Sequence, residues 1–254
     1  MRELTAPRAG GITAALFAAW ANGDPHRPRL VWHGTGRTEL SSASLMNWSA
    51  KTAGYLVDEL GATPGRPVLW RVRRSWQGLP LLLGCWWAGL TVVDDEAMAG
   101  DVVAAFVDVG DDADADEVVV ASPHPFGLAV PDLPALQRNV ADAILPQADR
   151  FTPRSPGPGP DAPAVATATG LLTVGAVLAG AARAAASLGD QAVLLSTQLS
   201  ALPAGVIAGP LAAWATDGTY VYTEPPADRV AVDERATATI GIDLPGLPRA
   251  GARG

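Results

Sequence analysis

The sequence predicts an α/β fold made of two similar, doubly wound and mostly parallel α/β units. Short runs rich in Val and Leu, without polar alternation, are typical of strands that helices cover on both faces, and they alternate with helical stretches. The stretch WWAGLTVVDDE (86–96) also returns later in the chain as WATDGTYVYTE (214–224). The repeat indicates that the same helix end, glycine turn and strand occur once in each half.

A stretch rich in proline and glycine, residues 153–163, separates the two predicted units. Proline fixes φ and glycine frees the backbone, so no regular element is expected there. We therefore expect a first unit over residues 1–152 and a second, smaller unit over residues 164–243. The last residues, 244–254, are expected to form a flexible tail.

The first unit is expected to contain one long helix whose apolar residues recur near the 3.6-residue period. Ser41 or Ser42 can cap the start of this helix, and Gly61 can end it. The expected elements are, in order, a strand at 27–36, a helix at 41–61, a strand at 67–72, a helix at 76–89, and strands at 90–94, 104–108 and 117–122.

The second unit is expected to repeat the order strand, helix, strand, helix, strand. Alanine-rich stretches predict its helices, and runs of Val, Leu and Tyr predict its strands. The expected elements are a strand at 162–170, a helix at 171–189, a strand at 191–197, a helix at 203–216, and strands at 219–223 and 237–243.

The composition of the 254 residues, 48% hydrophobic and 17% charged, excludes a disordered chain. The formal net charge of −8 argues against a nucleic-acid or anionic-membrane partner, because phosphate groups would be repelled. The one cysteine, Cys85, cannot form an internal disulfide and lies in an apolar run typical of a core. It and the three histidines are widely spaced, so we predict no metal site and no cofactor.

No segment is expected to cross a membrane. The uncharged run at 79–93 is shorter than the roughly 18–20 residues that a spanning helix needs. A cytoplasmic location is therefore predicted. The alternative is export, because residues 11–23 follow Arg2 and Arg8 and resemble a short signal segment.

Residues 24–93 present a D-x-x-R-P opening, a helix ending in L-G, a P-G turn, and a helix ending in W-x-A-G before a V-V strand. This order resembles the start of AMP-forming acyl-CoA synthetases, which belong to the adenylate-forming superfamily. The resemblance covers residues 24–145 and, more loosely, 160–224, and the chain looks like a short bacterial protein related to a truncated synthetase. It implies the fold of the N-terminal domain of adenylate-forming enzymes, which contains two similar α/β subdomains.

The resemblance also locates the segment that binds ATP phosphates in the family. There, the strand matching residues 164–169 leads into a Ser/Thr/Gly-rich loop that ends in lysine. Here the sequence is ATATGLLTVGAV, so no such loop is expected, and Thr167, Thr169 and Gly170 are weak candidates for ligand contact. A P-loop is not indicated either, because Ala176 stands where that motif has lysine. The alternative is a plain strand-to-helix turn.

A second weak candidate for ligand contact is Tyr222, Thr223 and Glu224. These residues look like the family's aromatic–Gly–x–Thr–Glu motif for adenine and magnesium, with Val221 in place of glycine. The internal repeat places them opposite residues 92–96 instead, on a strand that precedes the true motif in the family. The alternative is therefore a buried strand without ligand.

The stretch ASPHPFG (121–127) supplies weak catalytic candidates. Ligands of open α/β sheets gather at the carboxyl ends of strands, where Ser122 and His124 are expected to lie near Asp94 and Asp95. A Ser/His/Asp group can activate a hydroxyl. The alternative is a rigid surface loop, because prolines flank His124 on both sides.

Together these features predict a degenerate, synthetase-like protein that is a non-catalytic scaffold or interaction module, with AMP-forming ligase activity not expected. The family's phosphate loop and its C-terminal domain with a catalytic lysine have no counterpart in the sequence, and Lys51 matches neither family lysine. A protein partner or a second copy could bind through tryptophans such as Trp20, Trp48 or Trp76, unless all eight tryptophans are core residues. The alternative is a weak enzyme, or a binder of an adenylate, acyl or CoA-like molecule, in the cleft between the units.

Overall fold

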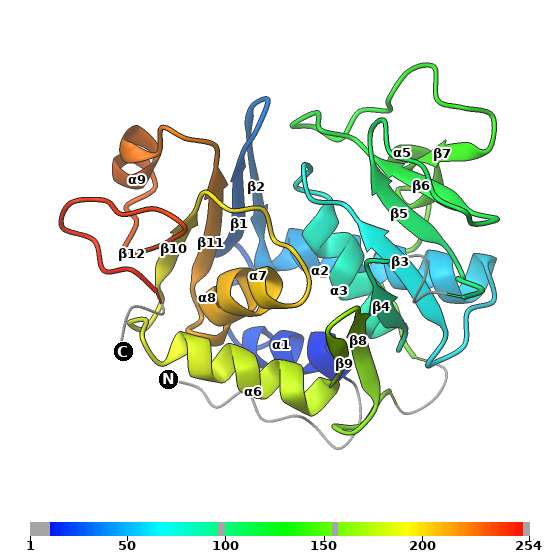
Figure 1. The fold of residues 1–254 in the computed structure, drawn as a ribbon, viewed down its shortest axis with the longest axis horizontal. Coiled ribbons are helices and arrows are strands. Elements are labelled where there is room, and N and C mark those ends of the chain that lie inside the picture. The colour runs from blue at the N-terminus through cyan, green and yellow to red at the C-terminus, as the bar shows by residue number, and fades with distance from the viewer. Residues whose placement is uncertain (1–10, 96–99, 154–156, 251–254) are drawn as a thin grey trace.

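The computed structural model describes residues 11–95, 100–153 and 157–250, which form two mainly parallel sheets with helices packed between and around them. Figure 1 shows the two sheets side by side, with α2 (Ser42–Gly54) and α3 (Gly78–Trp87) between them. This arrangement confirms the predicted α/β fold with two mostly parallel units.

Sheet A has five strands in the order β12-β10-β11-β1-β2. Every neighbouring pair is parallel except the hairpin of β1 and β2. The strands are β1 (Pro28–His33), β2 (Arg37–Ser41), β10 (Val193–Ser196), β11 (Thr219–Thr223) and β12 (Ala238–Ile240).

Sheet B has seven strands in the order β7-β6-β5-β3-β4-β8-β9, and only the hairpin of β8 and β9 is antiparallel. Its central strands are buried along their length, as their unbroken Val and Leu runs predict. The strands are β3 (Pro67–Arg71), β4 (Thr91–Val93), β5 (Ala105–Asp108), β6 (Val118–Ala121), β7 (Gln137–Asn139), β8 (Pro163–Thr167) and β9 (Gly170–Thr173).

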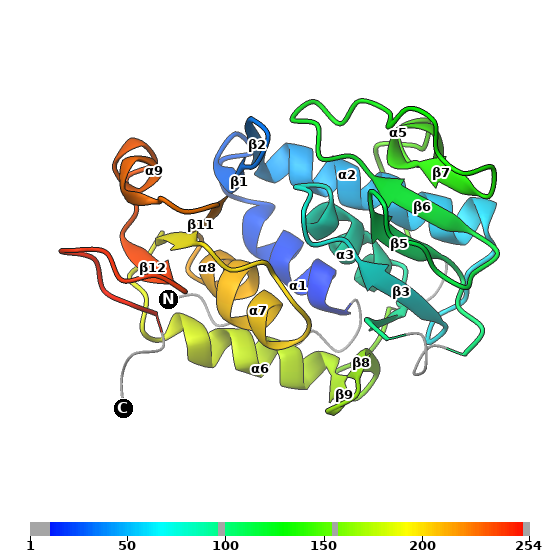
Figure 2. The same cartoon turned by 45° about the horizontal axis from the view of Figure 1, so that its top comes forward.

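The remaining helices cover the two sheets. Helix α1 (Gly11–Trp20) lies between α3 and α6 (Val174–Ala185), as Figure 2 shows. Helix α2 continues into a π-helical turn at Tyr55–Glu59. The others are α5 (Val140–Ala143), a run formed by α7 (Ala204–Val206), a π-helical turn at Ile207–Leu211 and α8 (Ala212–Ala215), and α9 (Asp228–Asp233).

The internal repeat corresponds to an exchange of hairpins between the sheets. Each repeat begins with a hairpin, β1–β2 or β8–β9, followed by a helix whose first turn is capped by Ser41 or Thr173. This hairpin pairs with the strand that ends the repeat in the other half, β1 with β11 and β8 with β4. The two tryptophans of the repeat also make equivalent contacts with the other half. The Trp86 indole N–H donates to the Ala164 carbonyl at 3.0 Å, and that of Trp214 donates to the Arg29 carbonyl at 2.7 Å.

This pairing corrects the expected assignment of strands to units. The strand expected at 27–36 lies in the sheet of the second half, and the strand expected at 162–170 lies in the sheet of the first half. The apolar composition of a strand predicts its burial but not its partner, so sequence order alone did not reveal the exchange. The stretch at 153–163 links the two halves, and residues 154–156 within it lie outside the described residues.

Several elements differ from their predicted bounds. The helix expected at 171–189 spans only Val174–Ala185, because Gly170–Thr173 pair with β8 as a strand. The helix expected at 203–216 contains a π-helical turn at Pro210, whose missing N–H cannot make the regular helical bond. Strands β2 and β7 and helices α5 and α9 were not expected, since their short polar segments give no clear period.

The tryptophans belong to the core. Trp20 and Trp76 are each 3% exposed, and Trp48 is partly buried with its ring edge-on against Trp76. Trp20 and Trp76 are therefore core residues. Of the eight tryptophans, six are buried, and Trp48 and Trp87 are partly buried and pack against the core. The large apolar side chains that are exposed include Phe126, Leu136 and Val232.

Candidate functional site

Four of the predicted site residues lie together at the carboxyl ends of β4 and β8. Asp94 and Asp95 follow β4, and Thr167 and Thr169 lie at the end of β8 and in the turn after it. They line a cavity of about 380 Å³ whose other wall includes Leu202, from the loop that follows β10 in sheet A. The cavity thus lies between elements of both sheets.

The turn from β8 to β9 consists of only two residues, Ala168 and Thr169. The hydroxyls of Thr167 and Thr169 lie 2.8 Å apart, and the Thr169 amide donates to Thr167 Oγ1 at 3.3 Å. Gly170 has φ +134°, a backbone conformation that glycine adopts without strain. The side chains therefore satisfy a tight turn, at the place where the resemblance puts a phosphate-binding loop.

The structure does not bring Ser122 and His124 together with Asp94 and Asp95. Strands β5 and β3 lie between β6 and β4, so the two groups are separated by three strand spacings, or about 14 Å. Ser122 Oγ accepts from the His124 amide at 3.2 Å, and His124 Nδ1 accepts from the Phe126 amide at 3.1 Å. These contacts order the loop after β6, as the alternative interpretation proposes.

The segment Tyr222, Thr223 and Glu224 lies at the end of β11 in sheet A. The Tyr222 ring stacks on Trp32 with centroids 4.1 Å apart, and burial raises the pKa of Tyr222. Thr223 Oγ1 donates to the Glu224 carbonyl at 3.0 Å, and both of the first two residues are buried. These contacts are those of a packed strand.

Sequence reasoning missed a second cavity, of about 340 Å³, at the carboxyl ends of β3 and β5. It is lined by three arginines, two carboxylates and one leucine, which are Arg71, Arg73, Arg74, Asp108, Asp111 and Leu199. The signal in the sequence was the run RVRRSW, which places one arginine at the end of a buried strand and two more directly after it.

Comparison with known proteins places the fold. No family model matches the chain. A TIGR03089 family protein from Mycobacterium tuberculosis is 35% identical over 159 residues, which cover 58% of this chain and 65% of that protein. An acyl-CoA synthetase from Brucella canis superposes with a TM-score of 0.76 at 14% identity, over 93% of this chain and 48% of that one.

Two further solved structures agree. The fatty acid AMP ligase of Legionella pneumophila gives a TM-score of 0.70 at 13% identity, and MbtA of Mycobacterium smegmatis gives 0.67 at 19% identity. The chain has the fold of the N-terminal domain of adenylate-forming enzymes. The match with the ligase includes 95% of this chain and 45% of the ligase. The match with MbtA includes 91% of this chain and 48% of MbtA, so this chain spans about half the length of each. The resemblance that the sequence suggested is confirmed.

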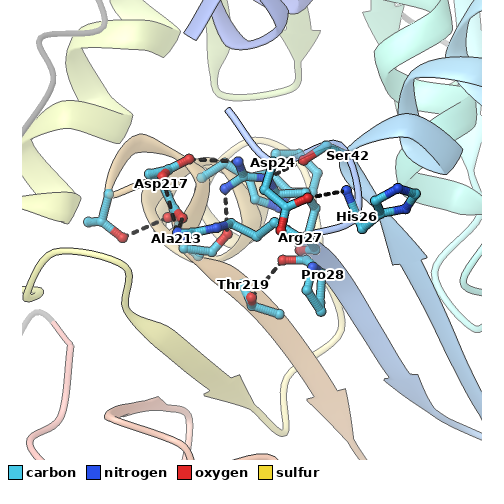
Figure 3. A network of polar contacts seen from close by, with 12 residues as sticks. Asp24, His26, Arg27, Pro28, Ser42, Ala213, Asp217 and Thr219 are labelled. Atoms are coloured by element: carbon cyan, nitrogen blue, oxygen red, sulfur yellow. Dashed lines mark hydrogen bonds and ion pairs between the residues drawn. The ribbon is translucent and has the colours of Figure 1, made fainter. Parts of the chain in front are cut away.

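Among the described residues, the most buried charge belongs to Arg29 on β1. Its side chain is 1% exposed and binds Asp217 at 2.6 Å and Ser42 Oγ at 2.8 Å, while the guanidinium lies 4.7 Å from the Trp20 ring centroid. Figure 3 shows Asp217 facing the segment of Asp24, His26 and Arg27. Burial lowers the pKa of Arg29, and the hydrogen bond and charge of Asp217 act in the opposite direction. The contacts of Arg29 with Asp217 and the Gly218 carbonyl connect β1 to the turn before β11.

The single lysine also has a structural role. Lys51 Nζ on α2 donates to the carbonyls of Leu145 and Gln147 and forms an ion pair with Asp149 at 2.9 Å. It thus binds carbonyl groups just after α5, where a cation is favourable. Its contacts tie the segment after α5 to α2, away from both cavities.

The described part of the chain contains neither a membrane-spanning helix nor a cluster of metal ligands. No helix within residues 11–95, 100–153 and 157–250 is long and apolar enough to cross a bilayer. The same residues contain no group of three His, Cys, Asp or Glu side chains that could hold a metal ion. The segment with Arg2 and Arg8 that resembles a signal lies partly outside the described residues.

Proposed function

We propose that this adenylate-forming fold does not adenylate carboxylates with ATP and acts as a non-catalytic binding or interaction module. The observation that supports this proposal is the two-residue turn between β8 and β9. A polyphosphate needs cations and preorganised N–H donors along its length, and a turn of this size offers neither.

The charge of the adjoining cavity supports the same proposal. Its described lining residues include the carboxylates Asp94 and Asp95 and no lysine or arginine, and Arg73, outside this lining, lies 3.9 Å from the Asp94 carboxylate. Bringing triphosphate oxygens beside two carboxylates costs Coulomb energy, which is large where water is partly excluded. The net charge of −8 adds a repulsive long-range field.

Calorimetry with MgATP tests the proposal, together with a pyrophosphate-exchange assay over a panel of fatty and aromatic acids. An active adenylate-forming enzyme run in parallel is the positive control. We expect no saturable heat in the millimolar range and no exchange above the buffer blank. Micromolar binding of MgATP, or exchange with any acid, would contradict the proposal.

A second candidate function is the binding of a small molecule in the same cavity. Its volume of about 380 Å³ lies within the range of ligand pockets, which is roughly 300–1,000 Å³. Its hydroxyl and carboxylate groups suit a neutral or cationic ligand with hydroxyl groups better than a polyphosphate. Thermal-shift screening with nucleosides tests this function, with AMP and CoA as anionic comparisons, and Thr169→Val is expected to reduce any saturable rise in Tm.

A further inference from the structure

The cavity at β3 and β5 lies where open α/β sheets bind ligands. In sheet B the chain passes from β3 to β4 on one side and then returns past β3 to β5 on the other. The gap between β3 and β5 is therefore the topological switch point, and ligands of such sheets bind outside the carboxyl ends of the strands there. The cavity lined by Arg71, Arg73 and Arg74 occupies that position.

A buried carboxylate holds the arginine segment in place. Asp108, at the end of β5, is 5% exposed at its side chain and accepts from the amides of Arg73 and Arg74 at 2.9 to 3.1 Å. The backbone thus satisfies much of the hydrogen-bonding capacity of this carboxylate, and the turn after β3 is fixed. The two arginine side chains that start from this turn are consequently presented to the cavity.

The guanidinium of Arg73 has spare hydrogen-bonding capacity. Within the described residues its Nε is buried without a hydrogen-bond partner. Its ion pair with Asp94 is 3.9 Å long, beyond hydrogen-bond distance. The side chain is nevertheless 39% exposed overall, so an incoming ligand can reach the guanidinium.

Arg74 has two carboxylate neighbours, and only one of them would have to be displaced. Its Nε lies 3.5 Å from Oδ2 of the buried Asp108, which holds the base of the guanidinium. Its Nη2 lies 3.2 Å from each carboxylate oxygen of Asp111, and the side chains of Arg74 and Asp111 are 58% and 43% exposed. Such exposed ion pairs contribute little, about 0–1 kcal/mol, so displacing Asp111 costs little. Leu199, from the loop after β10, supplies an apolar wall on the sheet A side.

We propose that this switch-point cavity binds the oxyanion of a small molecule, a phosphate monoester or a carboxylate, through the guanidinium groups of Arg73 and Arg74. The planar fork of arginine suits both oxyanions, since each offers two oxygens at matching spacing. Leu199 then contacts the apolar body of the ligand. This site goes beyond the proposed function and does not depend on it.

Calorimetric titration of the whole chain tests the proposal, with inorganic phosphate and acetate as separate probes at constant ionic strength. Saturable binding of either probe supports the site, and the better probe identifies the ligand class. Arg73→Gln is expected to weaken binding about tenfold, because a charge-assisted fork is lost. The matched control is Arg66→Gln, which removes the same charge beside the opposite end of β3.

Asp111→Asn provides the decisive second variant. If the bound oxyanion competes with Asp111 for Arg74, this change tightens binding about two- to fivefold, the equivalent of an exposed ion pair. A purely structural arginine cluster predicts no gain. The variant also decides the question if Arg73→Gln fails to fold.

Three results would overturn the proposal: neither probe binds, Arg73→Gln binds as well as the wild type, or Asp111→Asn binds no more tightly. The outcome is separable from the test with ATP. Nucleotide binding at the β8–β9 turn would survive Arg73→Gln, and would contradict the proposed function while leaving the switch-point site to its own test.

Discussion

At the scale of single residues, the ion pair of Arg29 and Asp217 joins a buried charge to a partly exposed one, since the two side chains are 1% and 33% exposed. Removing the partner of a buried charge leaves that charge without compensation, which costs about 3–5 kcal/mol where both groups are buried and less where water reaches one of them. Asp217 has φ +60°, a conformation that asparagine tolerates, so Asp217→Asn removes charge without new backbone strain. Because water reaches Asp217, we expect this variant to lose about 1–3 kcal/mol of unfolding free energy in urea titrations.

The control for this prediction is Asp233→Asn. Asp233 pairs with Arg229 one helical turn away, and both side chains are largely exposed, at 58% and 92%. Its loss should change the unfolding free energy by less than about 0.5 kcal/mol. Equal effects of the two substitutions would show that Arg29 does not depend on Asp217.

Glu234 gives a pH-dependent prediction. Its hydrogen bonds with Arg37 and then His33 hold its pKa below the ordinary value of 4.5. A carboxylate whose pKa is lowered by folding stabilises the native state above the unfolded pKa, and this stabilisation is lost as pH falls through the folded pKa. Glu234→Gln should therefore destabilise the protein at pH 7 and much less below pH 4.5.

Chemical unfolding of wild type and Glu234→Gln at several pH values measures this difference. Asp243→Asn is the control, since its carboxylate is 78% exposed and pairs only with Arg249 among the described residues. If the difference in unfolding free energy between wild type and Glu234→Gln stays constant from neutral to acid pH, the charge of the Glu234 carboxylate is not the cause of the destabilisation.

At the scale of elements, the closest helix packing joins α2 and α3. A Cβ added at Gly84 would overlap Thr52 Cβ and lie 2.9 Å from the Ser49 carbonyl oxygen. The two helices would have to separate, and overpacking of this kind costs about 1–3 kcal/mol. Gly84→Ala should therefore lower Tm by several degrees in a thermal melt followed by circular dichroism.

Gly189→Ala is the matched control for Gly84→Ala. Nothing lies within 4 Å of a Cβ at Gly189, so this substitution should leave Tm unchanged or slightly raised. If Gly84→Ala were equally harmless, the interface between α2 and α3 would be looser than its contacts indicate.

Helices and strands were predicted correctly where apolar residues recur with a clear period. They were missed in short polar segments, where hydrogen bonds and strand pairing determine the structure. The buried strands from β3 to β6 and helix α2 were found within a few residues. Helix α6 was predicted to begin too early, because LLT before Val174 resembles a helical sequence until its pairing with β8 is known. For the sites, the sequence predicted Asp94 near Ser122, but the strand order separates them and brings Asp94 beside Thr167, a pairing that was not predicted.

At the scale of the whole molecule, the exchange of hairpins makes the two halves depend on each other. Sheet A without the first half loses β1 and β2, and β11 becomes an unpaired edge beside β10. Sheet B without the second half loses β8 and β9 and exposes β4, which is buried along its length. The Trp86 and Trp214 indoles also lose their acceptors, and an unpaired buried N–H costs about 1–3 kcal/mol.

The predicted division into residues 1–152, 153–163 and 164–243 can be tested by cutting the chain near its middle. If the halves were separate domains, pieces 1–160 and 161–254 would each fold alone. Because each sheet contains strands of both halves, we expect either piece alone to expose its apolar strands and to lack protected amides. Co-expressed, the two pieces should copurify as a 1:1 complex with the protection pattern of the intact chain.

Hydrogen exchange of Val31 and Val165, on β1 and β8, is the sharpest readout, since both pair across the halves. Protection of Val165 in the isolated 161–254 piece would mean that β8 does not need β4, and that the halves are independent after all.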